Sequence, residues 1–109
     1  MKVIKGVKIA TTNCGIKYKN RDDLLLIYFE NEANIAGVFT QSSMPAAPVV
    51  WCKKNIKHGK AKALVVNAGN ANAFTGKIGE ETVVKTAKKV SEILNCKEEE
   101  IFVSSTGVI

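Results

Sequence analysis

Cysteine, histidine and aromatic residues are scarce in this sequence, and each scarcity excludes a class of protein. The three cysteines, Cys14, Cys52 and Cys96, are odd in number and widely spaced, without a Cys-x-x-Cys pair. This argues against a disulfide framework and against a zinc site, so we expect free thiols. The only histidine, His58, stands directly before Gly59, as is typical of a helix C-terminus. A self-sufficient Ser-His-Asp or Cys-His site is therefore not predicted.

Long apolar runs are also missing. The longest, such as Leu24–Phe29 and Ala63–Val66, are far shorter than the roughly 20 residues that span a bilayer. Lysines at positions 2, 5 and 8 interrupt the N-terminus, which excludes the apolar stretch of a secretory signal. We therefore expect a cytoplasmic protein with no membrane partner.

Acidic residues are absent between Ala33 and Gly79, where six lysines carry the same net charge of +6 as the whole chain. Five of these lysines lie in residues 53–62, while Arg21 is the only arginine. Because few aromatics and no arginines accompany the lysines, the pattern favours a solvated helix end and loop, and no nucleic-acid partner is expected. The alternative is a non-catalytic basic module for an acidic partner or nucleic acid, whose binding would weaken steeply with salt.

The 109 residues, 46% of them hydrophobic, suit one domain of mixed α/β structure. Short extended pieces are predicted within Val3–Lys17, with a turn at Thr11–Gly15. The apolar run Leu24–Phe29 predicts a strand that is buried on both faces and forms an antiparallel hairpin with Ile35–Thr40. A helix is predicted to begin near Pro48 and to end before Gly59.

The second half of the chain predicts a parallel βαβ unit at residues 61–105. Its first strand is Ala61–Asn67, and its second begins at Ile101. Between them, the helix Glu80–Leu94 has an apolar stripe at helical spacing. The stripe consists of Val83, Val84, Ala87, Val90, Ile93 and Leu94.

Two segments follow the strands of this unit, where ligands gather in α/β folds. The first is Asn67–Ala73, in which Asn67, Asn70 and Asn72 offer amide donors and acceptors on a backbone of small residues. The second is Ser104–Gly107, which places hydroxyls beside a glycine N–H, as an oxyanion site requires. Turns and helix caps also favour both compositions, so the residues alone leave a structural role open for each.

Several ordered motifs resemble the glutamate N-acetyltransferases of arginine biosynthesis, also called ornithine acetyltransferases. The Asn-Ala-Gly-Asn-Ala-Asn-Ala string is the most specific of them. The motifs are Gly37-Val38-Phe39-Thr40, Ala46-Ala47-Pro48-Val49, Ala63–Ala73, Thr75-Gly76 with Gly79, and Ser105-Thr106-Gly107-Val108-Ile109.

This resemblance implies a mixed α/β sandwich and an enzyme that moves an acetyl group from N-acetylornithine to glutamate without a cofactor. It implies autocatalytic cleavage into two chains, with the nucleophilic threonine at the start of the second, and an oligomer of alpha and beta chains. Thr106 and Gly107 match the pair that forms the oxyanion hole in that family. Asn67, Asn70 and Asn72 match its signature loop and become candidates for the substrate pocket.

Members of that family are several times longer than this chain, and their threonine nucleophile would lie beyond Ile109. We therefore expect residues 1–109 to be a single incomplete domain, the N-terminal portion of an alpha chain, and to be inactive alone. A nucleophile, a metal site and a cofactor are not expected within it.

Overall fold

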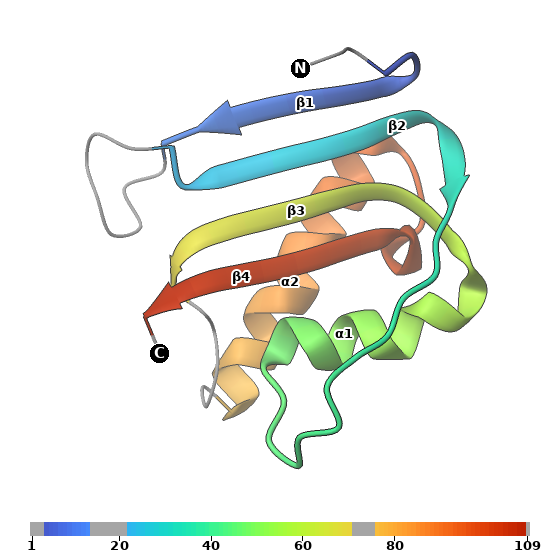
Figure 1. Ribbon diagram of the computed structural model, residues 1–109. Coiled ribbons are helices and arrows are strands. Elements are labelled where there is room, and N and C mark those ends of the chain that lie inside the picture. The colour runs from blue at the N-terminus through green and yellow to red at the C-terminus, as the bar shows by residue number, and fades with distance from the viewer. Residues whose placement is uncertain (1–3, 14–21, 71–75, 109) are drawn as a thin grey trace.

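A four-stranded mixed sheet with two α-helices forms the framework of the protein (Figure 1). The computed structural model describes residues 4–13, 22–70 and 76–108. The strands lie in the order β1-β2-β3-β4; β2 pairs antiparallel with β1 and β3, and β3 pairs parallel with β4. The elements are β1 (Val7–Thr12), β2 (Leu24–Asn34), α1 (Ala47–Asn55), the 3₁₀ turn η1 (Ile56–His58), β3 (Lys60–Asn70), α2 (Gly76–Leu94), the 3₁₀ turn η2 (Glu98–Glu100) and β4 (Ile101–Val108). The predicted α/β class is confirmed.

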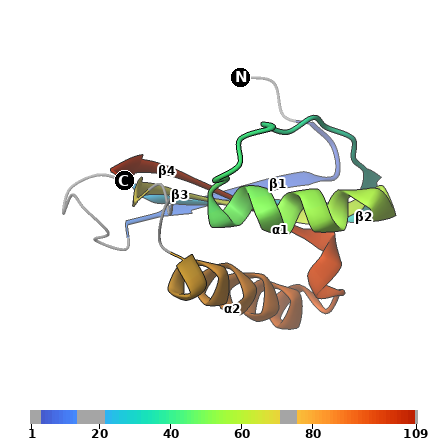
Figure 2. The same ribbon diagram turned by 90° about the horizontal axis from the view of Figure 1, so that it is seen from below.

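The β3–α2–β4 unit confirms the predicted parallel crossover. Helix α2 covers one face of the sheet, and α1 lies along the β4 edge (Figure 2). The buried residues of α2 recur every four positions, at Gly79, Val83, Ala87 and Ser91. The predicted stripe was too wide, since Val84 and Ile93 are 42% and 68% exposed. The sheet therefore uses a narrower helix face than the apolar pattern indicated.

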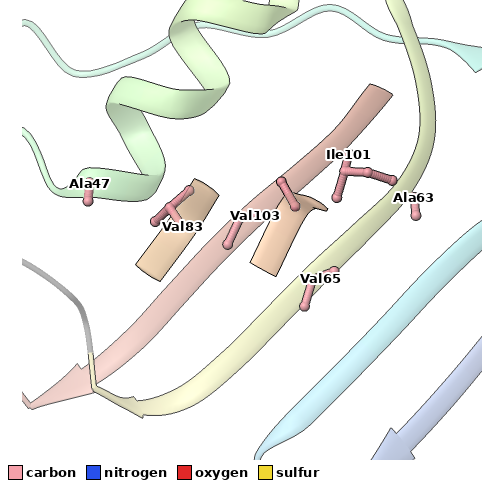
Figure 3. Close-up of a cluster of buried hydrophobic side chains, with 7 residues drawn as sticks. Ala47, Ala63, Val65, Val83, Ile101 and Val103 are labelled. Atoms are coloured by element: carbon pink, nitrogen blue, oxygen red, sulfur yellow. The ribbon is translucent and has the colours of Figure 1, made fainter. Parts of the chain in front are cut away.

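Small side chains fill the core between the sheet and the helices (Figure 3). Residues two apart on each strand point to the same face, so Ala63 and Val65 of β3 stand beside Ile101 and Val103 of β4. Because these residues are small or β-branched, α2 can approach the strands closely through Val83 and Ala87. The core cluster consists of Ala47, Ala63, Val65, Val83, Ala87, Ile101 and Val103.

The predicted hairpin of residues 24–40 is wrong. Strand β2 continues through the expected turn to Asn34, and residues 35–40 leave the sheet. Because β1 and β3 occupy the two sides of β2, no hydrogen-bonding edge remains there for a further strand. The run Leu24–Phe29 is half-buried and not fully buried, since α2 covers only one face of the sheet.

The boundaries of α1 follow the predicted signals. Pro48 lies in the first turn, where a missing N–H costs no helical hydrogen bond. After η1, Gly59 takes the left-handed conformation with φ of 68°, which glycine adopts without steric strain. No helix in the described part of the chain combines the length and apolar character needed to cross a bilayer.

The N-terminal prediction is only partly tested. Extended structure is confirmed for β1, whereas Thr11 and Thr12 belong to this strand and not to a turn. The rest of the predicted turn, from Cys14 onward, lies outside the described residues.

Candidate functional site

Strands β3 and β4 bring the two candidate segments together at their carboxyl ends (Figure 1). In the parallel register Asn67 lies opposite Ser105, Ala68 opposite Thr106, and Gly69 opposite Gly107. Thr106 is exposed. Segments that are far apart in the sequence thus share one hydrogen-bonded ladder. Asn70 continues the ladder opposite Val108, whereas Asn72 lies outside the described residues.

The strand predicted to end at Asn67 continues to Asn70, so the loop prediction is wrong for residues 68–70. Asn67–Asn70 belongs to β3 because its backbone pairs with β4 over the whole stretch. The turn preference of asparagine and glycine is a weak tendency that ladder hydrogen bonds override. Asn67 and Asn70 are therefore strand residues.

Two buried polar atoms mark the point where the apolar core gives way to this site. Asn67 Oδ1 and Ser105 Oγ are both shielded from solvent and have no hydrogen-bond partner within the described structure. By strand alternation they follow Val65 and Val103 on the α2 face of the sheet. Because unpaired buried polar atoms are costly, such groups in folded proteins call for an explanation beyond packing.

Helix α1 supplies hydrogen-bond donors to the outer edge of β4. Trp51 Nε1 donates to the Ile101 carbonyl at 2.8 Å, and Cys52 Sγ donates to the Val103 carbonyl at 3.3 Å. Since every second residue of a strand directs its N–H and C=O to the same side, Ser105 and Gly107 direct theirs to this edge as well. The sequence analysis predicted a free thiol at Cys52, which is confirmed, but it did not predict this hydrogen bond.

The electrostatics of Cys52 fit a donor and not a nucleophile. Burial is the largest influence and raises the pKa of its thiol above the ordinary value, while the Val103 backbone lowers this pKa by a smaller amount. The thiol is therefore protonated at neutral pH, as donation to a carbonyl requires.

An apolar cavity of about 340 Å³ adjoins the same strands. Residues 35–39 and the first turns of α1 line it together with Ser104 and Ser105. Two of the motifs that carry the family resemblance, at Gly37 and at Ala46, thus meet beside a third. Gly37 approaches Ile56 so closely that a Cβ would lie 3.3 Å from its Cδ1, which favours glycine at this wall.

The basic segment lies around η1 and the start of β3. Lys60 Nζ donates to Asn34 Oδ1 at 2.5 Å, and Lys62 Nζ donates to the Glu30 carbonyl at 2.8 Å. His58 Nε2 pairs with Glu99 Oε2 at 3.2 Å across η1 and η2. Within residues 4–13, 22–70 and 76–108, no group of three or more His, Cys, Asp or Glu side chains could hold a metal ion.

Known proteins of one family match this chain. The sequence model of the ArgJ family matches residues 8–109. The arginine biosynthesis bifunctional proteins ArgJ of Bradyrhizobium diazoefficiens and Brucella suis are 55% and 54% identical over the whole chain, which spans only 26% of their length.

Two solved structures resemble the chain closely over 96% of its residues. The bifunctional protein ArgJ of Bacillus halodurans gives a TM-score of 0.90 at 36% identity, with 55% of that chain covered. The ornithine acetyltransferase of Mycobacterium tuberculosis, complexed with ornithine, gives 0.91 at 35% identity, with 57% covered. The chain belongs to the ArgJ family.

Proposed function

We propose that the complete enzyme, meaning this chain with the remaining part found in its relatives, transfers an acetyl group from N-acetylornithine to glutamate. In the first step a threonine hydroxyl outside this chain attacks the acetyl carbonyl. Ornithine leaves with a proton, and an acetyl-threonine ester remains. In the second step the glutamate amine attacks this ester, which gives N-acetylglutamate and regenerates the hydroxyl.

Within that reaction, Thr106 and Gly107 form the oxyanion hole. Each attack places negative charge on the carbonyl oxygen, and preorganised donors stabilise that charge. The single observation that carries this role is the pair's position at the end of β4, where Thr106 is exposed and the Gly107 N–H is directed to the β4 edge by alternation from Ile101 and Val103. Thr106 adds a hydroxyl from the neighbouring position.

Asn67, Asn70 and Asn72 belong to the substrate pocket in this proposal. The position of Asn67 opposite Ser105 and of Asn70 opposite Val108 supports it, because both then lie on the strand that pairs with the oxyanion pair. Amides orient polar substrates without a change of charge, which suits the amino-acid portions of ornithine and glutamate.

Cleavage into two chains is part of the same proposal. The chain covers 26% of the Bradyrhizobium protein but 55% of the solved Bacillus chain, so the solved polypeptide is about half as long as the curated one. This difference supports a processed enzyme in which an alpha and a beta chain share the site. The cytoplasmic location stays a prediction.

The test compares Thr106→Ala with wild type in the complete enzyme. The acetyl-transfer rate, followed as N-acetylglutamate formed from labelled N-acetylornithine and glutamate, should fall about a hundredfold, the usual loss for one oxyanion donor. The matched control is Thr12→Ala, since Thr12 is exposed at the end of β1 and should leave the rate unchanged. The 109-residue chain alone should form no product.

An unchanged rate in Thr106→Ala would remove this residue from the site. Turnover by the 109-residue chain alone would contradict the division of roles, because the nucleophile would then have to lie within it.

A further inference from the structure

The side chains of Trp51 and Cys52 on α1 donate hydrogen bonds to two successive carbonyls on the outer edge of β4, those of Ile101 and Val103. Both bonds join a side chain of one helix to the same edge of one strand, at 2.8 Å and 3.3 Å. Trp51 packs against the core cluster, and its own carbonyl accepts a hydrogen bond of 2.9 Å from Asn55 Nδ2. The donors are therefore anchored to packed structure.

The Ile101 and Val103 carbonyls, which accept these hydrogen bonds, directly precede the candidate site in the sequence. Val103 precedes Thr106 by three residues, about 10 Å along an extended strand. No bend separates them, because β4 pairs with β3 in unbroken register from Ile101 to Val108. A displacement of β4 at Val103 is thus transmitted to Thr106 and Gly107, and oxyanion donors act only within a narrow range of distance.

We propose that Trp51 and Cys52 are positioning residues for the Thr106–Gly107 pair. They hold the outer edge of β4 at a fixed distance from α1, so that the Gly107 N–H and the Thr106 hydroxyl keep their place when charge develops on the substrate. The inference rests on the proposed function, since it assigns the hydrogen bonds a role in that reaction. In this proposal neither side chain contacts the substrate.

The experiment measures the steady-state kcat and KM of acetyl transfer from N-acetylornithine to glutamate in the complete enzyme. Trp51→Phe keeps the ring and removes the donor, and Cys52→Ala removes the thiol; each should lower kcat by about three- to tenfold, the equivalent of one hydrogen bond. KM should change less than about twofold, because ground-state contacts are untouched. Cys52→Ser, which restores a donor, should recover most of the loss.

Two control variants separate positioning from packing. Cys96→Ala removes a half-buried thiol after α2, and Val50→Ala changes a partly exposed residue on α1 itself; both should keep the wild-type kcat. Each rate is normalised to the folded fraction from circular dichroism. If the Cys52→Ala variant does not fold, Trp51→Phe decides, because it also removes a donor to β4.

The inference is overturned if Trp51→Phe and Cys52→Ala lower only the melting temperature and keep the wild-type kcat per folded enzyme. In that case Thr106→Ala, measured in parallel, still shows its hundredfold loss and the proposed function stands. A wild-type rate in Thr106→Ala overturns the proposed function itself.

Discussion

The paired strands β3 and β4 have two halves that share one hydrogen-bond ladder but differ in the burial and the chemistry of their side chains. In the first half, Ala63, Val65, Ile101 and Val103 are at most 4% exposed and pack under the helices. The second half, from Asn67 and Ser104 onward, carries amides, hydroxyls and glycines, and Thr106 is exposed. Continuous backbone pairing therefore passes from a packed core into a polar site.

This difference shows how a polar site without its own apolar core can keep a fixed geometry. The apolar half supplies the stabilising free energy, since burial of these side chains drives folding. The polar half receives its geometry through the ladder and through α1. Stability and acetyl transfer should consequently respond to substitutions in different halves.

The largest effect is expected in the apolar half. Ile101 is fully buried, and Ile101→Ala should lower the free energy of unfolding by about 2–5 kcal/mol through lost burial and a cavity. Urea unfolding of the complete enzyme measures it. Ile93→Ala is the control, since Ile93 is 68% exposed and should cost less than about 0.5 kcal/mol. Equal losses in both variants would contradict the assignment of Ile101 to the core.

A smaller effect concerns the Cys52 thiol, which joins α1 to the apolar half of β4. Burial raises the pKa of Cys52 above its ordinary value of 9.0, so the folded protein holds the proton more tightly than the unfolded chain. The resulting stabilisation is complete below pH 9.0 and is lost as pH rises through the folded value.

At pH 8, iodoacetamide should therefore modify Cys52 about tenfold more slowly in folded than in urea-unfolded protein, because the folded form holds less thiolate and shields it. Mass spectrometry of the peptide that contains Cys52 gives both rates. Equal rates would show that the thiol is freely accessible and is not buried against β4.

The smallest effect lies at the junction of the halves. Ser105 Oγ is buried without a partner among the described residues, so Ser105→Ala should raise the free energy of unfolding by up to about 1 kcal/mol through relief of a desolvation cost. Ser104→Ala is the control at an exposed neighbour. A destabilised Ser105→Ala would mean that the remaining part of the enzyme supplies a partner for the hydroxyl.

Much of the fold could be predicted where one physical pattern dominates. The spacing of Val83 and Ala87 marked α2, and the order strand, helix, strand predicted the parallel pair. The hairpin prediction failed because an apolar run specifies a strand but not its partner. Nothing in Leu24–Phe29 indicates that β1 and β3 take both sides of β2.

The candidate site could be predicted in its residues but not in its arrangement. Thr106, Gly107 and the asparagines stood out through composition and family resemblance. Their pairing depends on the β3–β4 register, which places Asn67 opposite Ser105. The donors from Trp51 and Cys52 could not be foreseen, because they depend on which carbonyls of β4 face outward and on where α1 rests.

The contact between α1 and β4 also limits the edges at which another strand can be added to the sheet. The Ile101 and Val103 carbonyls already accept hydrogen bonds from α1, so another polypeptide cannot use them to add a strand there. The opposite margin is β1, where Ile9 is 53% exposed. Among the described residues, pairing with a further strand is therefore confined to β1 and to the part of β4 beyond Val103.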